Sequence, residues 1–301
     1  MSEVIDIAPP HYADYVLEDL LRWREEGQKT ALLTLVRIDG SSPRPAGSQI
    51  AVAADGRATG AITGGCVEQT LVRDALTAMA RGQNHVELYG EGSCFRDIVL
   101  PCGSGIHVCF DVTLEDARLK ALVEARRARR RAVYVCAGPD GAYSRDYCPQ
   151  PRLIVVGQGH IVPLLAHMAT LSEFEVIALS PDEATRMRTP GAQGMYGGSG
   201  IEPGIESGWI DGATAVVSLF HDHDYEPGVL RAALGSEAFY IGALGSRATH
   251  LRRLEGLRAD GWDEAALSRI QGPVGLDIGA KTPPEIALAV MAGVVRAWRQ
   301  L

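Results

Sequence analysis

Two cysteines stand in glycine turns, where a thiol could act as a nucleophile or a metal ligand. Cys66 follows Gly64 and Gly65 and precedes apolar residues that recur at helical spacing. At a helix N-terminus the dipole lowers the pKa of a thiol and raises its thiolate fraction. Cys102 stands in a similar Pro/Gly turn ahead of an alternating strand. Both are candidate catalytic thiols; the alternative for Cys66 is a small buried hydrophobe.

The residues around Cys66 could also hold an anion. We expect the backbone N–H groups of Gly64 and Gly65 to be open to an anionic ligand. Glu68 is a further catalytic candidate in this turn. An acid in the first helical turn is, however, favourable for the helix dipole alone.

Two histidines follow an apolar run in the second half of the chain. His221 and His223 come directly after the predicted strand 213–220, and in an extended chain they share one side. Residues just past the carboxyl end of a parallel strand line the usual ligand crevice. His221 is therefore a catalytic candidate. The sequence identifies no third metal ligand, so hydrogen-bonded positioning is favoured over metal binding.

The segment 152–182 predicts the first β-α-β unit of a nucleotide-binding domain. A β-branched run at 153–156 leads into Gly157 and Gly159, and a helical pattern follows at once, beginning after His160. Two glycines permit a tight turn, and a phosphate could bind at the helix N-terminus. A second strand, 175–179, ends at Ser180.

The dinucleotide fingerprint is incomplete in this unit. Val162 occupies the third glycine position, and Ser180 stands where an acid would bind the ribose 2′-hydroxyl. With Arg186 and Arg188 close behind, NADP is easier to accommodate than NAD. The alternative is a nucleotide-binding fold whose cleft serves another purpose.

A second glycine turn offers another anion site. Gly245, Ser246 and Arg247 follow the predicted strand 238–243, and Arg247 is available for an anion. The alternative is a helix cap by Ser246 with a surface arginine.

The elements that must position these residues divide the chain into two α/β domains, 1–148 and 149–301, at the Gly/Pro-rich linker 138–151. In the first domain the patterns predict helices at 12–26 and 114–130, a helix after Cys66, and strands at 30–38, 49–53, 58–62, 86–89, 106–111 and 132–137. In the second, segment 181–208 is weakly patterned, and helices are predicted at 226–234, 250–259, 263–270 and from Thr282 onward.

Composition narrows the class of protein. The 301 residues are 46% hydrophobic, which suits two soluble globular domains. A net charge of −8 argues against general binding to nucleic acid or to an anionic membrane. No signal peptide or membrane span is recognised, so the cytoplasm is the simplest location. The six cysteines form no CxxC pair, and we expect free thiols.

Seven separated motifs, in order, resemble the XdhC/CoxI family of molybdoenzyme accessory proteins. They are SSPRPAG (41–47), GGCVE (64–68), PCGSGI (101–106), VVGQGH (155–160), HDHDYE (221–226), IGALGSR (241–247) and GLDIGAKTPPEIA (275–287). The resemblance implies an N-terminal XdhC/CoxI α/β domain and a C-terminal Rossmann-like domain with a doubly wound parallel sheet. In three positions the sequence departs from the family pattern. Thr63 precedes GGC and Ser104 follows CG, where the family has glycine, and Ser180 replaces the acid that is common after the second Rossmann strand.

The resemblance also implies a function. Such proteins bind molybdenum cofactor, hold it while a cysteine desulfurase supplies its sulfido ligand, and pass it to a xanthine dehydrogenase-type apoenzyme; many are homodimers. Cys66 and Cys102 match the cysteines of the family motifs, and Cys66 is the candidate molybdenum ligand because a soft thiolate suits that metal. The cofactor-binding candidates are Gly64, Gly65, Cys66, Gly157, Gly159, His160, Ser180, Gly245, Ser246 and Arg247.

Three hypotheses follow. The first is a molybdenum cofactor chaperone without turnover of its own. The second is an NAD(P)-dependent oxidoreductase of a small molecule, in which Gly157 and Gly159 hold the pyrophosphate and His221, Asp222 or Cys66 handles a proton. The third is a scaffold that only bridges desulfurase and molybdoenzyme. Fold alone does not decide among them.

Overall fold

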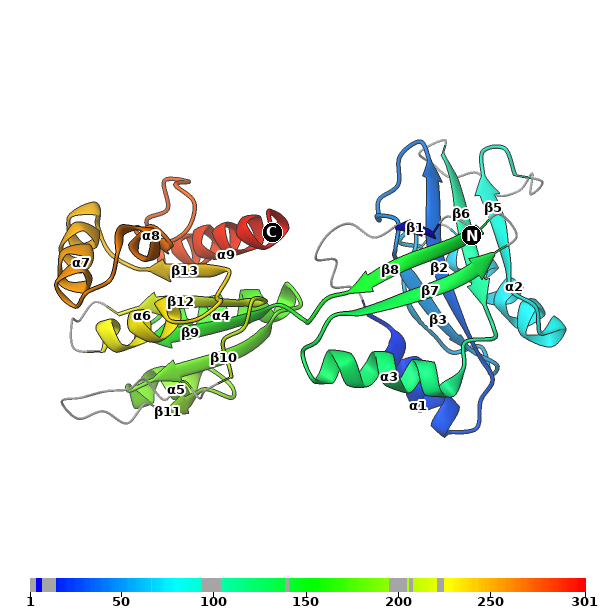
Figure 1. The fold of residues 1–301 in the computed structure, drawn as a ribbon, viewed down its shortest axis with the longest axis horizontal. Helices are drawn as coiled ribbons and strands as arrows, with labels where there is room; N and C mark the ends of the chain where they lie inside the picture. The colour runs from blue at the N-terminus through cyan, green and yellow to red at the C-terminus, as the bar shows by residue number, and fades with distance from the viewer. Residues whose placement is uncertain are drawn as a thin grey trace. The chain divides into compact units, whose positions relative to one another are not determined.

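The computed structural model describes residues 4–6, 15–65, 67–93, 104–138, 141–194, 205, 208–220 and 225–301. Cys66, Cys102, His221 and His223, and the start of the helix expected from residue 12, lie outside these residues. Contacts divide the chain into two compact units, Met1–Pro149 and Gln150–Leu301 (Figure 1). Over the described residues no helix is both long and apolar enough to cross a membrane.

The N-terminal unit is built on a five-stranded antiparallel sheet with the order β4-β3-β2-β6-β5. Its strands are β2 (Thr30–Asp39), β3 (Gln49–Ala53), β4 (Ala58–Gly60), β5 (His85–Gly90) and β6 (Gly105–Asp111). The remaining elements are β1 (Val4–Asp6), α1 (Leu17–Glu25), α2 (Glu68–Arg81), α3 (Asp116–Arg127), β7 (Ala132–Gly138) and β8 (Gly141–Tyr147).

Both faces of this sheet are buried. Helix α2 covers one face, where Leu71 packs with Ile106 and Phe110. On the other face α1, α3 and the strands β7 and β8 enclose a second core that contains Leu20 and Leu122. The sheet is thus a rigid layer from which loops can project.

The predicted linker 138–151 is wrong in part, because it contains β8. This strand pairs antiparallel with β7, with Tyr134 opposite Arg145. Arg145 is fully buried and hydrogen-bonds through its guanidinium to the side chain of Gln49, and the Tyr147 hydroxyl donates to the same oxygen at 2.7 Å. The inward face of β8 is therefore partly polar, and a search for apolar alternation misses it.

The C-terminal unit is a six-stranded parallel sheet with the order β11-β10-β9-β12-β13-β14. Its strands are β9 (Arg152–Gly157), β10 (Glu175–Ser180), β11 (Gln193–Gly194), β12 (Thr214–Leu219), β13 (Tyr240–Ala243) and β14 (Ile270–Gln271). Read from its first strand, the order is 3-2-1-4-5-6, that of doubly wound dinucleotide-binding folds. The expected Rossmann-like domain is confirmed.

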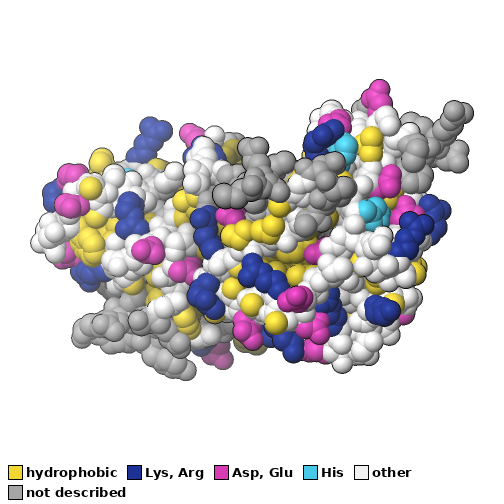
Figure 2. Space-filling model, turned by 45° about the vertical axis from the view of Figure 1, so that its right-hand side comes forward, with side chains coloured by type: hydrophobic (Ala, Val, Ile, Leu, Met, Phe, Trp, Pro, Cys, Tyr) yellow, Lys and Arg dark blue, Asp and Glu magenta, His cyan; other side chains and the backbone are white. Residues whose placement is uncertain are grey.

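Helices cover both faces of the parallel sheet (Figure 1). They are α4 (Ile161–Leu171), α5 (Glu183–Arg188), α6 (Glu226–Leu234), α7 (Arg247–Ala259), α8 (Glu264–Leu267) and α9 (Pro283–Arg299). Helices α4 and α9 share one core, which contains Leu165 and Val290, and α6 shares the other with Leu257 of α7. On the face seen in Figure 2, Lys and Arg side chains lie among Asp and Glu side chains rather than in one large patch.

The sequence patterns did not predict three short elements, α5, β11 and β14. Segment 181–208, expected to be irregular, contains α5 and β11. Helix α5 begins because Asp182 accepts a hydrogen bond from the Thr185 N–H at 2.8 Å, which is a local cap rather than an apolar period. The helix expected at 263–270 ends at Leu267, and Ile270 begins β14 instead.

One glycine of the β9 turn is fixed by close packing of two strands. A Cβ atom on Gly157 would lie 2.8 Å from the carbonyl carbon and the Cβ atom of Leu219 in β12. Backbone at that distance cannot move aside without distorting the sheet. Gly157 thus permits β9 and β12 to approach at the point where the strand order reverses.

We predict that Gly157→Ala destabilises the protein by about 1–3 kcal/mol, the usual penalty for overpacking. Urea unfolding measures the change. Gly212→Ala is the matched control, because a Cβ atom there meets nothing within 4 Å and the residue is exposed. Equal unfolding midpoints for the two variants would contradict the assigned packing.

Candidate functional site

The loops that carry three of the motifs leave the same edge of the N-terminal sheet. The strand register pairs Asp39 with Gly105, Gly90 with Gly105, and Ile50 with Gly60. Loops 40–48, 61–67 and 91–104 therefore all begin or end at this edge. The fold thus brings the loop of Cys66 and the loop of Cys102 to one edge of the sheet, although neither cysteine lies among the described residues.

Two of these loops are tied together directly. The Ser104 hydroxyl donates a hydrogen bond to the Ser41 carbonyl oxygen. A Cβ atom on Gly40 would lie only 3.0 Å from the Cβ atom of Ser104. Ser104 therefore serves as a tether where the family pattern has a glycine.

Glu68 organises the third loop. Its carboxylate accepts hydrogen bonds from the backbone N–H groups of Thr63, Gly64 and Gly65, each at 2.8 Å, and from the Thr63 hydroxyl. Longer bonds come from the N–H groups of Ile62 and Val67, at 3.3 and 3.2 Å. One side chain at the start of α2 thus fixes the turn that leads to Cys66.

These bonds hold Glu68 in its ionised form. Partial burial favours a higher pKa, but the bonds from the Thr63 N–H, the Thr63 hydroxyl and the Gly64 N–H outweigh burial and lower the pKa to about 2. An acid with that pKa is a permanent negative charge at neutral pH. Positioning of the loop is therefore the role that its contacts support.

The expected free N–H groups of Gly64 and Gly65 are not found, because Glu68 accepts both. We expected these N–H groups to bind an anion from outside the protein. Instead, the Glu68 carboxylate is the anion that they bind. Both glycines have left-handed φ angles, 89° and 127°, and a Cβ atom on either would meet nothing within 4 Å. The turn is thus open to solvent on its glycine side.

In the C-terminal unit the candidate residues share the carboxyl edge of the parallel sheet. Gly157 ends β9 and is followed by Gly159 and His160, Ser180 ends β10, and the turn 245–247 follows β13. This edge is the usual ligand crevice of such sheets. His221 lies outside the described residues.

At the end of β10 the chain satisfies its own polar groups. Ser180 is fully buried, and its hydroxyl accepts from the Asp182 N–H at 3.2 Å, so a ribose or 2′-phosphate contact by Ser180 is not supported. Arg186 donates to the carbonyl oxygens of Ser180 and Pro181 at 2.9 and 2.8 Å. The Gly159 N–H donates to the Thr185 hydroxyl at 2.8 Å. These contacts weaken the expectation of NADP binding here.

The turn after β13 has the alternative geometry considered above. Ser246 caps α7 by accepting from the Thr249 N–H at 3.1 Å, so α7 begins at Arg247 and not at residue 250. Arg247 is exposed and lines a cavity of about 370 Å³, together with Asp277. Among the described residues, the Arg247 side chain has no ion-pair partner beside this cavity.

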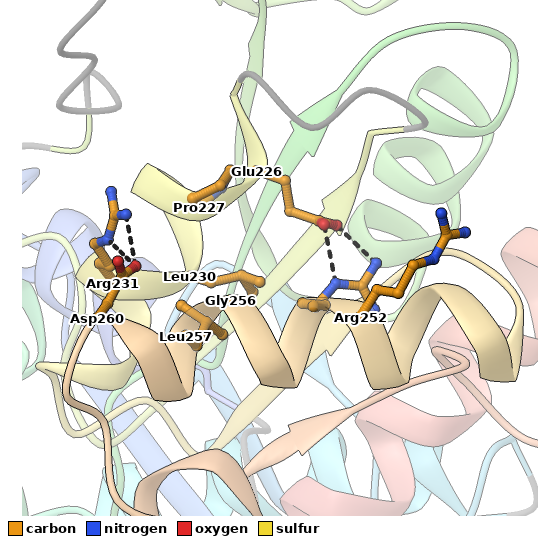
Figure 3. A pocket seen from close by; sticks show the side chains of 9 residues that line it. Glu226, Pro227, Leu230, Arg231, Arg252, Gly256, Leu257 and Asp260 are labelled. Atoms are coloured by element: carbon orange, nitrogen blue, oxygen red, sulfur yellow. Dashed lines mark hydrogen bonds and ion pairs between the residues drawn. The ribbon is translucent and has the colours of Figure 1, made fainter.

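A buried ion pair stabilises the carboxyl edge of the parallel sheet. Arg253 of α7 donates two hydrogen bonds to the Glu226 carboxylate, both at 2.9 Å. Glu226 lines a cavity of about 330 Å³ between α6 and α7 (Figure 3). Glu226 also accepts from the Ser218 hydroxyl at 3.3 Å, and Arg253 donates to the Leu244 carbonyl at 2.6 Å. The pair joins the ends of β12 and β13. No local pattern predicts it, because its members are 27 positions apart.

Among the described residues, no group of three or more His, Cys, Asp or Glu side chains could hold a metal ion. The role of Cys66 as a molybdenum ligand, like the roles of Cys102 and His221, stays a prediction.

We predict that Glu68→Gln lowers the free energy of unfolding by about 1–2 kcal/mol at pH 7, because a neutral amide accepts the loop N–H bonds more weakly and Glu68 is half-buried. The folded-state pKa, about 2, lies below the ordinary value of 4.5. The stabilisation is therefore complete above about pH 5 and disappears as pH falls toward 2. Urea unfolding of both proteins at several pH values measures it. Glu237→Gln, at an exposed position, is the control.

We predict that Arg253→Met lowers the free energy of unfolding by about 3–5 kcal/mol, since it leaves a buried carboxylate unpaired. The side chains of the pair are only 3% and 6% exposed. Arg231→Met is the control, because the Arg231–Asp260 pair is 50% and 38% exposed and should contribute less than about 1 kcal/mol. Equal losses of unfolding free energy in the two variants would show that the buried pair contributes no more to stability than the exposed pair.

Comparison with known proteins agrees with this architecture. Residues 23–90 match the XdhC and CoxI family, and residues 153–294 match the XdhC Rossmann domain. The chain is 32% identical to the molybdenum cofactor insertion chaperone PaoD of Escherichia coli (strain K12), over 89% of this chain and 83% of the relative. It is 25% identical to a protein of Bacillus subtilis (strain 168) described as a probable component of xanthine dehydrogenase, over 92% and 96%.

A solved structure has the same fold. The crystal structure of a xanthine dehydrogenase from Bacillus halodurans matches 96% of each chain with a TM-score of 0.76 and 21% identity. The matches to both family domains, in the expected order, agree with the seven motifs found in the sequence. This chain therefore belongs to the XdhC/CoxI family.

Proposed function

We propose that this chain is a molybdenum cofactor chaperone, which holds the cofactor during sulfuration and inserts it into a xanthine dehydrogenase-type molybdoenzyme. The observation that carries the proposal is the 32% identity, over most of both chains, to a relative named as a molybdenum cofactor insertion chaperone. The partners we propose are the apoenzyme and a cysteine desulfurase, with a second copy of the chain in a homodimer.

The N-terminal loop edge fits this cargo. Thiolates are soft ligands that suit molybdenum, and the sequences of loops 61–67 and 91–104, which adjoin strand ends at that edge, each contain at least one cysteine. The bound cofactor would supply the metal, and the desulfurase would supply the sulfur that becomes its sulfido ligand. The chain would contribute Cys66 as the ligand or sulfur carrier, Cys102 as a second thiol, and Glu68 as the residue that fixes the turn.

The strand order of the C-terminal unit is that of dinucleotide-binding folds, but the described contacts at its sheet edge count against the oxidoreductase. A dinucleotide would have to displace the Thr185 hydroxyl from the Gly159 N–H, and Ser180 is buried. A scaffold that only bridges two proteins would not need the cysteines of these loops. The following experiment distinguishes a scaffold from a chaperone.

We predict that protein purified from a host that makes molybdenum cofactor carries molybdenum and pterin, and that Cys66→Ala loses most of both. Metal analysis and pterin fluorescence measure the content. Cys148→Ala is the control, because Cys148 is a buried thiol that follows β8. Client activation by the Cys66→Ala protein at the wild-type level would instead support the scaffold. Empty wild-type protein would contradict the proposal.

A further inference from the structure

The cavity beside Arg247, here called the β13 cavity, lies at the carboxyl ends of β13 and β14. It has a volume of about 370 Å³, within the range of small-molecule sites. Its apolar lining includes Val274, Leu276, Ile278 and Ile286, from the loop after β14 and the first turn of α9. The cavity is thus large enough for one fused ring system and its substituent.

The walls of the β13 cavity are fixed by close packing. A Cβ atom on Gly275 would lie 2.7 Å from the backbone of Ala289, so the loop lies directly against α9. The Gly275 N–H donates to the Tyr240 hydroxyl at 3.2 Å. At the turn after β13, Arg253 of the buried ion pair donates to the Leu244 carbonyl and so holds the turn that leads to Arg247. The cavity is therefore formed before any ligand binds.

Two charged side chains reach this cavity from different elements. Arg247 stands in the first turn of α7, and Asp277 stands in the loop after β14. Within the described part of the chain, neither side chain takes part in an ion pair or a side-chain hydrogen bond. Their position suits a ligand with an anionic end and an end that donates hydrogen bonds.

We infer that the β13 cavity binds a phosphorylated fused pyrimidinone ring that carries a 2-amino and a 4-oxo group. The apolar side chains would contact the faces of the ring. The Asp277 carboxylate, which only accepts hydrogen bonds, would take two from the ring N–H and the 2-amino group. Arg247, at the start of α7, would bind the phosphate. Pterins and guanine nucleotides share this chemistry.

This assignment deepens the proposed function and rests on it in one respect: the C-terminal unit is taken to hold an organic part of the cofactor. It also places the ligand on the β13 side of the crevice. On the β10 side the Gly159 N–H and Arg186 already bond to the chain itself. The two sides of the sheet edge thus differ in what they leave for a ligand.

Titration calorimetry of the purified full-length chain tests the inference with three probes: neopterin monophosphate, guanosine 5′-monophosphate and cytidine 5′-monophosphate. We expect at least one of the first two to bind, and cytidine 5′-monophosphate, which lacks the 2-amino-4-oxo edge, to bind about tenfold more weakly or less well. Binding of only one of the first two identifies the source as a pterin or a guanine nucleotide. Arg247→Ala should weaken binding about tenfold or more.

Two further variants make the test specific. Asp277→Asn should reduce the preference over cytidine 5′-monophosphate, because an amide presents a donor where the carboxylate presents an acceptor. Arg252→Ala, on the same helix but lining the other cavity, is the control and should bind as wild type does (Figure 3).

The inference is overturned if neither fused-ring probe binds, if cytidine 5′-monophosphate binds equally well, or if Arg247→Ala and Arg252→Ala weaken binding equally. Far-ultraviolet circular dichroism verifies that each variant is folded. Probe binding in a protein that retains no molybdenum would reject the proposed function and keep this site, whereas molybdenum retention without probe binding would do the reverse.

Discussion

In the N-terminal unit, one carboxylate accepts hydrogen bonds from the backbone N–H groups of the turn before Cys66 and so determines the conformation of that turn. Backbone N–H groups without partners are costly, and the turn 62–67 directs several of them to a single point. Glu68 occupies that point, and its pKa of about 2 keeps the charge present at any physiological pH. The turn before Cys66 is therefore set by the chain itself, and cargo binding does not have to order it.

In the C-terminal unit the two sides of the sheet edge differ in whether their polar groups are already bonded within the chain. Around β10 the polar groups bond to one another, and Thr185 and Arg186 leave little for a ligand. Around β13 the backbone is held by the Glu226–Arg253 pair, while Arg247 and Asp277 have no ion-pair partner in the described part of the chain and line a cavity. Among the described residues, a fold associated with dinucleotides thus has its uncommitted charged side chains on the β13 side.

The sequence predicted the elements with strong periodicity. β3 and α6 begin and end where expected, and the capping box of Thr282 and Glu285 marks the start of α9. It missed β8, whose inward face carries Arg145, and α5, which depends on a local cap. In the candidate sites, the glycine turns could be read from residue types. The bonds of Glu68 and the burial of Ser180 could not, since their partners are set by how the chain turns in space.

In the ligand crevice, the Thr185 hydroxyl competes with any bound nucleotide for the Gly159 N–H. A hydroxyl of the protein stands where an oxygen of a nucleotide pyrophosphate would accept the same N–H. A nucleotide that took this place would break a formed hydrogen bond, which costs on the order of 1 kcal/mol or more. Since about 1.4 kcal/mol is a factor of ten in affinity, this contact alone could lower the affinity for abundant cellular dinucleotides severalfold. The contact thus makes the crevice selective against dinucleotides.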